Sequence, residues 1–232
     1  MKHQSLTDHY PPSLKVCGLT KLDQIQALIT INTDFLGFIF YEKSPRYVLN
    51  HLTLEEILTI EHPGKVGVFV NEKVDKIIDR TQKAGLNFIQ LHGDESDDFI
   101  IELREKLNPE TSIIKVIRIG NNTPESRNKV AQIFTISTSD LPVSYYLFDT
   151  DSKAFGGTGK QFDWSILNEL NIPRPYFLSG GISEENVGHI ETLNQKPFAL
   201  DINSKFEISP GNKDIERIKK FSQTIQSPNR TI

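Results

Sequence analysis

Two reactive side chains of this sequence stand at the ends of short apolar runs. Cys17, the single cysteine, ends the run "LKVC", and Asp149 ends the run "YYLFD". A thiolate can remove a proton from carbon and a protonated carboxyl can donate one, so the pair could act as general base and general acid. Two alternatives stay open. Cys17 could be a small buried side chain without chemistry, and Asp151 or Asp163 could be the relevant carboxylate.

Polar side chains also follow other apolar runs. Arg46 lies in "YEKSPRYV", directly after a turn at Ser44–Pro45. Arginine binds a carboxylate through two parallel hydrogen bonds, although a solvated loop arginine would fit the same position. Gln90 and His92 share one face of "QLHGDE". They could position a ligand or could be polar residues held by hydrogen bonds inside the fold.

Three glycine-containing segments could bind an anion through backbone N–H groups. They are "GGTGK" at 156–160, "LSGGI" at 178–182 and "LDINSKFEISPG" at 200–211. None has the spacing of a nucleotide-binding P-loop, and the first could equally be a flexible loop. The last two follow the seventh and eighth apolar runs, where a phosphate site is common in parallel barrels.

The elements that must position these residues form a repeated pattern. Eight apolar runs predict strands at 14–17, 35–40, 65–70, 88–91, 113–119, 145–148, 176–179 and 199–202. Helical spacing follows each of them, at 22–29, 53–60, 71–85, 96–107, 125–134, 163–170, 183–193 and 214–225. Repeated strand–helix units imply a parallel sheet, and eight units favour a closed (β/α)8 barrel over an open doubly wound sheet.

Local signals support this assignment. Thr53 with Glu56 predicts a capping box, Asn71 predicts a helix cap and Gly85 predicts a helix end. Side chains alternate along a strand, so Lys15 and Cys17 are expected to point into the barrel if Leu14 and Val16 pack against the helices. Functional groups of such barrels lie at the carboxyl ends of the strands.

Composition narrows the class of protein. The 232 residues carry a net charge of −4 with no long block of like charge, so we expect no nucleic-acid partner. The start has no apolar core of a secretory signal, and the run at 35–40 is too short to span a membrane. We expect a cytoplasmic protein with a polar extension over 1–13 and one barrel domain over 14–232.

The ordered motifs carry a resemblance to a known family. "KVCG", "GFIFYEKSPRYV", "VGVFVNE", "IQLHGDE", "FDT", "GGTGKQFDW", "LSGGI", "ALDINSKFE" and "PGNKD" occur in sequence between residues 15 and 214. In this respect the chain resembles the phosphoribosylanthranilate isomerases of tryptophan biosynthesis. The resemblance implies a (β/α)8 barrel without cofactor or metal. It also implies an Amadori rearrangement of N-(5'-phosphoribosyl)anthranilate to 1-(2-carboxyphenylamino)-1-deoxyribulose 5-phosphate.

The resemblance implies a role for each matching residue. Asp149 would be the general acid, Cys17 the general base and Arg46 the group that binds the anthranilate carboxylate. His92 and Asp201 would line the pocket, and Gly157, Gly180, Gly181, Ser204 and Lys205 would bind the phosphate. A thiol with a pKa of ~8.5 needs only a modest downward shift for this role at neutral pH.

One position departs from the family, because Lys205 stands where a glycine is usual. We expect ordinary φ there, with Lys205 facing solvent or the phosphate. The partner is expected to be a small phosphosugar. The alternatives are another phosphosugar barrel enzyme, such as an indole-glycerol-phosphate synthase or a ribulose-phosphate epimerase, and a non-catalytic phosphosugar-binding barrel. Monomer and homodimer stay open.

Overall fold

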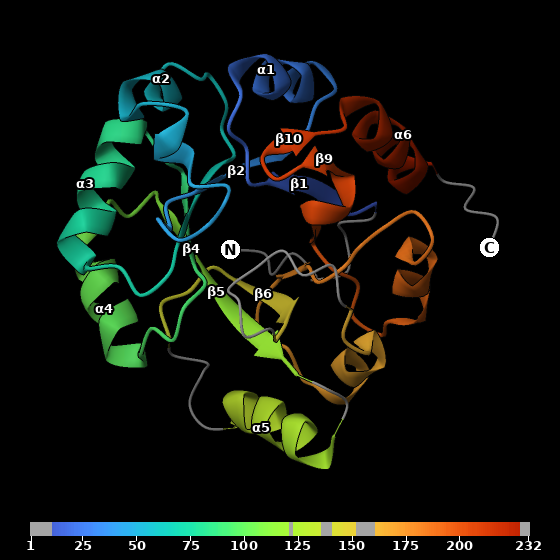
Figure 1. The fold of residues 1–232 in the computed structure, drawn as a ribbon. Helices are drawn as coiled ribbons and strands as arrows, with labels where there is room; N and C mark the ends of the chain where they lie inside the picture. The colour runs from blue at the N-terminus through green and yellow to red at the C-terminus, as the bar shows by residue number, and fades with distance from the viewer. Residues whose placement is uncertain (1–10, 121–122, 136–140, 152–160, 228–232) are drawn as a thin grey trace, which may run out of the picture.

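The computed structural model describes residues 11–120, 123–135, 141–151 and 161–227. Eight parallel strands form a closed barrel in chain order, as Figure 1 shows, so the predicted fold class is confirmed. The strands are β1 (Ser13–Cys17), β2 (Phe35–Ile39), β3 (Lys65–Phe69), β4 (Phe88–Leu91), β5 (Ser112–Ile119), β6 (Tyr145–Thr150), β7 (Tyr176–Leu178) and β8 (Ala199–Ile202). Each of the eight predicted runs forms one of them.

Helices surround the barrel (Figure 1). The α-helices are α1 (Leu22–Thr30), α2 (Leu54–Leu58), α3 (Val74–Ala84), α4 (Asp97–Lys106), α5 (Pro124–Thr135) and α6 (Ile215–Gln226). The 3-10 helices are η1 (Val48–Asn50), η3 (Trp164–Glu169), η4 (Val187–Thr192) and η5 (Ser204–Phe206). The α-helices that the spacing predicts after β6 and β7 are therefore 3-10 helices. Their buried residues, such as Val187 and Ile190, lie three apart, which fits the tighter period as well.

The predicted helix boundaries hold at Thr53 and Gly85 but not at Asn71. Thr53 and Glu56 form the capping box of α2, and Gly85 ends α3 with a φ of 62°. Asn71 has a φ of 49°, and its Oδ1 accepts a hydrogen bond from the Asp94 backbone N–H. Asparagine tolerates this left-handed conformation. Asn71 therefore links the loop after β3 to the loop after β4 through its side chain, and α3 begins only at Val74.

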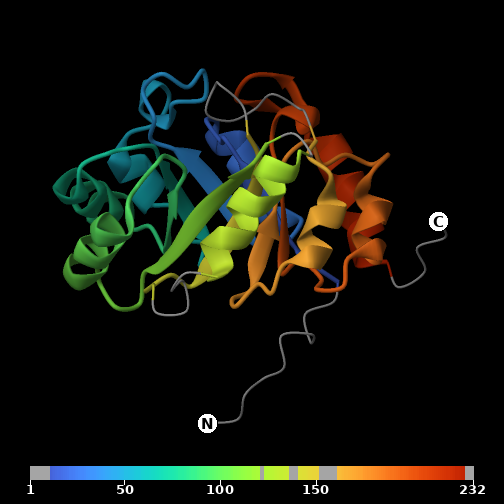
Figure 2. The ribbon, with the colours of Figure 1, turned by 90° about the horizontal axis from the view of Figure 1, so that it is seen from below.

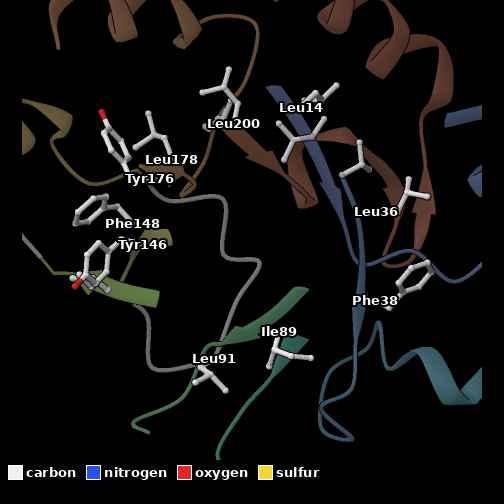
Figure 3. Packing of buried hydrophobic residues seen from close by; sticks show 14 of the residues in the cluster. Leu14, Leu36, Phe38, Ile89, Leu91, Tyr146, Phe148, Tyr176, Leu178 and Leu200 are labelled. Carbon is white, nitrogen blue, oxygen red and sulfur yellow. The ribbon is translucent and has the colours of Figure 1, made fainter. Parts of the chain in front are cut away.

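Strand side chains alternate between two cores. A larger cluster, whose strand residues include Leu14, Leu36, Ile89, Tyr146 and Leu200, packs between the barrel and its helices (Figure 3). A smaller cluster fills the barrel, with Phe35, Val66, Ile114, Val116, Leu147, Phe177 and Ala199. The alternation directs Lys15, Cys17 and Asp149 to the inner side, as the two-residue period requires.

A short antiparallel hairpin separates the last barrel strand from α6. It consists of β9 (Glu207–Ser209) and β10 (Asn212–Lys213). In Figure 2 the red hairpin and the blue segment after β2 lie at the same end of the molecule. Within the described ranges, no helix has the length and apolar character needed to cross a membrane.

Candidate active site

Buried Lys15 occupies the inside of the barrel, one inward position before Cys17. The register of β1 with β8 sets Lys15 opposite Asp201. Its ammonium donates hydrogen bonds of 2.8 Å to Asp201 Oδ2 and of 2.8 Å to Gln90 Oε1. The carboxylate outweighs the cost of burial and raises the pKa of Lys15, so this residue stays charged. A fixed positive charge therefore lies beneath the carboxyl end of β1.

Cys17 fits against a glycine of the neighbouring strand. Cys17 pairs with Gly37 of β2 and is 5% exposed. A Cβ added at Gly37 would lie 2.9 Å from Cys17 Cα and 3.0 Å from its Sγ. Any larger residue at position 37 would have to displace both the backbone and the thiol of Cys17. Gly37 was not among the predicted site residues, although a lone glycine within a strand pattern signals a close approach.

The surroundings of Cys17 disfavour its thiolate. Burial raises the pKa of Cys17, and the charges of Lys15 and Lys213 offset this only in part. The downward shift that a general base would need is therefore not found at Cys17, whose pKa lies above its ordinary value. The physical reason is that β1 and β2 remove the sulfur from water, which disfavours the thiolate more than two nearby ammonium groups favour it.

Asp149 lies at the end of β6 within reach of His92. Its Oδ1 accepts a hydrogen bond of 2.8 Å from the Thr150 N–H, and its Oδ2 is 3.3 Å from His92 Nε2. Gly180 has a φ of 83°, and a Cβ there would lie 3.3 Å from Asp149 Oδ1 and 2.5 Å from Thr150 Oγ1. The backbone after β7 can therefore approach the carboxylate only because residue 180 is glycine.

Asp201 presents one oxygen to Lys15 and keeps the other without a partner. Burial raises the pKa of Asp201, while the Lys15 ammonium acts against this rise. Its Oδ1 is buried and has no hydrogen-bond partner among the described residues. Leaving a carboxylate oxygen in this state is costly, so Oδ1 is suited to accept a hydrogen bond from a bound hydroxyl group.

Arg46 is held in place by Glu207, which the sequence did not single out. Arg46 is 7% exposed, and its Nε donates hydrogen bonds of 2.9 and 3.0 Å to the Glu207 carboxylate. Its Nη2 donates a further one of 2.5 Å. Lys213 Nζ lies 2.7 Å from Glu207 Oε1 and 2.8 Å from Asn203 Oδ1. Burial lowers the pKa of Lys213, and Glu207 acts against this. With Lys213 and Arg46 both charged, the cluster carries a net positive charge.

The first loop of the barrel brings this cluster next to Cys17. Gly18 has a φ of 77°, and a Cβ there would lie 2.6 Å from Arg46 Cδ and 3.0 Å from Asn203 Oδ1. The solvated loop arginine is therefore wrong for Arg46. Its side chain packs across the loop that follows the cysteine. Its guanidinium is paired with the carboxylate of Glu207.

The predicted phosphate residues lie at two adjacent strand ends. Gly180 and Gly181 follow β7 with φ of 83° and 74°, and Ser204 with Lys205 forms part of η5 after β8. Lys205 is exposed and has no positive φ, as expected. Gly157 and Lys160 lie outside the described residues. The described part of the chain contains no group of three or more His, Cys, Asp or Glu side chains that could hold a metal ion.

Fold and site together define a class. A closed parallel barrel with a thiol, carboxylates and basic groups at the carboxyl ends of its strands is a (β/α)8 barrel of the enzyme type. The family model described as N-(5'phosphoribosyl)anthranilate (PRA) isomerase matches residues 14–224. The chain belongs to this family of isomerases.

Individual relatives agree with this assignment. An N-(5'-phosphoribosyl)anthranilate isomerase of Parabacteroides distasonis is 38% identical over 218 residues, which are 93% of this chain and 94% of the relative. The crystal structure of the Thermotoga maritima enzyme has a TM-score of 0.74 at 31% identity, covering 93% of this chain and 98% of that one. A further similar structure is that of a phosphoribosyl anthranilate isomerase in complex with reduced 1-(o-carboxyphenylamino)-1-deoxyribulose 5-phosphate. Its TM-score is 0.70 at 30% identity, over 93% of this chain and 98% of that one.

Proposed function

We propose that residues 14–232 form one catalytic barrel of tryptophan biosynthesis. It converts N-(5'-phosphoribosyl)anthranilate to 1-(2-carboxyphenylamino)-1-deoxyribulose 5-phosphate. One observation carries this proposal: Cys17 and Asp149 both stand on the inner side of one barrel, at the carboxyl ends of β1 and β6. Family membership and the relative with a bound reduced product support the same reaction.

Asp149 is the general acid of the first step. Its carboxyl gives a proton to the ring oxygen of the ribose, the bond between that oxygen and C1 breaks, and the nitrogen lone pair forms an iminium at C1. The Thr150 N–H binds Oδ1 of this carboxyl and His92 lies beside Oδ2. These contacts fix the orientation of the carboxyl that gives up the proton.

Cys17 is the general base of the second step. Its thiolate removes the proton from C2, and the electrons of that bond form the C1–C2 double bond of an enolamine. The enolamine then gains a proton at C1 and loses the proton of its C2 hydroxyl, which gives the ketone at C2. Burial disfavours the thiolate before substrate binds, whereas the positive charge of the iminium beside the sulfur favours it. Lys15 and Lys213 act in the same direction as the iminium.

Arg46 binds the anthranilate carboxylate. Glu207 occupies Nε and Nη2 of the guanidinium, and Nη1 has no partner among the described residues, so that nitrogen points a donor at the substrate. Lys213 balances the charge of Glu207. A substrate with two anionic groups is therefore attracted locally, although the protein carries a net charge of −4.

The phosphate binds at the adjacent ends of β7 and β8. Gly180, Gly181, Ser204 and Lys205 supply backbone N–H groups there. Gly157 belongs to the same proposal but lies outside the described residues. Positive φ at both glycines supports this assignment, because such backbone turns N–H groups toward an anion. The unpartnered Oδ1 of Asp201 accepts a hydrogen bond from a ribose hydroxyl.

A fluorescence assay with freshly made phosphoribosylanthranilate tests the proposal. We expect turnover by the purified protein, measured as loss of anthranilate fluorescence that depends on enzyme concentration. Tight binding of the product without turnover would instead favour a non-catalytic phosphosugar-binding barrel. If the protein neither converts the substrate nor binds the product, another phosphosugar enzyme would be favoured.

A further inference from the structure

A continuous series of polar contacts crosses the inside of the barrel from Asp149 to Lys15. Asp149 Oδ2 is 3.3 Å from His92 Nε2, and His92 Nδ1 is 3.0 Å from Gln90 Nε2. Gln90 Oε1 then accepts the hydrogen bond of 2.8 Å from Lys15 Nζ. Gln90 is 1% exposed and Lys15 is 0% exposed. The series links the strand of the proposed acid to the strand of the proposed base through β4.

The chemistry of the groups fixes the direction of each contact. An ammonium group only donates, so the group of Gln90 that faces Lys15 must be the carbonyl oxygen. The amide nitrogen of Gln90 then faces His92, and it too only donates. Nδ1 of His92 must therefore accept. A neutral imidazole with an accepting Nδ1 carries its proton on Nε2, the nitrogen that lies 3.3 Å from Asp149 Oδ2.

We propose that Gln90 is a positioning residue that holds His92 as the neutral Nε2–H tautomer. Its effect on the reaction rests on the proposed function of Asp149. An imidazolium beside Asp149 would hold the carboxyl in its ionised form, which has no proton to give to the ribose ring. A donor at Nδ1 prevents this state, because the second proton would meet an N–H group.

Other titratable groups lie near His92. They are Asp149 on β6, Asp201 on β8 and Glu95 in the loop after β4, while the Lys15 ammonium lies on the far side of Gln90. The amide donor at Nδ1 occupies the lone pair that a second proton would need, whichever of these groups is ionised.

Gln90→Glu tests the proposal with almost no change of shape. A carboxylate at position 90 would accept a hydrogen bond from an N–H at His92 Nδ1 and would still accept one from Lys15. The substitution therefore reverses the direction of the contact with His92 and keeps that of the contact with Lys15. With ¹⁵N-labelled histidine, NMR of the substrate-free wild-type protein is expected to show His92 with the proton on Nε2 and none on Nδ1. In Gln90→Glu, Nδ1 is expected to carry a proton. The kcat should fall roughly 10- to 100-fold with little change in KM, since a general acid contributes ~10²–10⁴.

Two further proteins make the outcome unambiguous. Gln195→Glu adds the same charge in the loop before β8 and is expected to leave both the His92 signals and kcat unchanged. A wild-type spectrum with the proton on Nδ1 would overturn the proposal whether or not Gln90→Glu folds. A Gln90→Glu protein with wild-type kcat would overturn it as well. Because the tautomer is read without turnover, failure of the proposed reaction would appear separately, as an absence of activity in the wild-type protein.

Discussion

At the scale of single residues, the thiol of Cys17 depends on a glycine of another strand. A Cβ at Gly37 would lie 2.9 Å from Cys17 Cα, closer than real Cβ contacts come, and 3.0 Å from Sγ, which is tighter than nine in ten of them. The lack of a side chain at residue 37 therefore leaves the space that the sulfur and the backbone of Cys17 occupy beside β2.

Gly37→Ala is expected to lower kcat strongly, because the added methyl group displaces the sulfur. Overpacking of this kind costs about 1–3 kcal/mol of folding free energy, so the barrel should still form. Steady-state kinetics and thermal unfolding measure the two effects. Gly188→Ala is the matched control, since a Cβ there has no neighbour within 4 Å. Equal activities of the two variants would show that the sulfur does not need the space at Gly37.

Arg46→Ala is expected to raise KM more than it lowers kcat. The guanidinium would bind a substrate carboxylate, and hydrogen bonds to charged groups are worth ~1.5–3 kcal/mol, which corresponds to a KM roughly 10- to 100-fold higher. Arg46→Lys keeps the charge but cannot bind Glu207 through two nitrogens while a third faces the substrate, so it should give an intermediate KM. An unchanged KM in the alanine variant would remove Arg46 from the carboxylate site.

At the scale of elements, the sequence predicted the strands well and the connections less well. Apolar runs of four to eight residues mark the strands because both faces of a closed barrel are buried. The two-residue period then put Lys15, Cys17 and Asp149 on one side. The hairpin β9–β10 was missed because strands of three and two residues are too short to show any alternation.

From the sequence, candidate site residues could be predicted only where they stand at or just after the end of a predicted strand. The contact between Arg46 and Glu207 joins residues 161 positions apart, and that between Lys15 and Asp201 joins residues 186 apart. No local pattern encodes such pairs, since barrel closure alone brings their elements together. For the same reason the raised pKa of Cys17 could not be read from its neighbours in the sequence.

The ion pairs of Glu207, at the start of the hairpin, should stabilise the fold at neutral pH and lose this effect in acid. Burial acts to raise the pKa of Glu207, but Arg46 and Lys213 outweigh it and hold this pKa below its ordinary value of 4.5. The unfolded chain therefore takes up the proton first as pH falls. The stabilisation is present above about pH 4.5 and disappears as pH falls through the lower folded-state pKa.

Glu207→Gln is accordingly expected to lower the free energy of unfolding at pH 7 and to reduce its decrease in acid. Urea denaturation at pH 7 and at several values below pH 4.5 would measure both. Glu61→Gln, at an exposed position, is the control and should keep the acid dependence of the wild type. The same acid dependence in Glu207→Gln would mean that this carboxylate does not contribute through its ion pairs.

At the scale of the whole molecule, the barrel concentrates charge inside a net acidic protein. Lys15, Arg46 and Lys213 are all buried at one end of the barrel, where Asp201 and Glu207 partly neutralise them. Such an arrangement attracts a small dianionic substrate without creating the broad basic surface that nucleic acid requires.

Catalysis by an acid and a base inside this barrel should not depend on a metal ion. Within the described residues no cluster of ligating side chains is present. Dialysis against a chelator is expected to leave kcat unchanged, measured before and after addition of Mg²⁺ or Zn²⁺. Loss of activity on chelation that a metal restores would contradict the acid–base scheme.

The most direct test of the central claim compares Cys17→Ser, Asp149→Asn and the double variant in the phosphoribosylanthranilate assay. Each single variant is expected to lose roughly 10²–10⁴ in kcat with its fold retained. The double variant should lose little more than the worse single variant, because the two groups serve one reaction sequence. Either single variant with near-wild-type kcat would contradict the account, since the proton transfer assigned to that residue would then belong to another group.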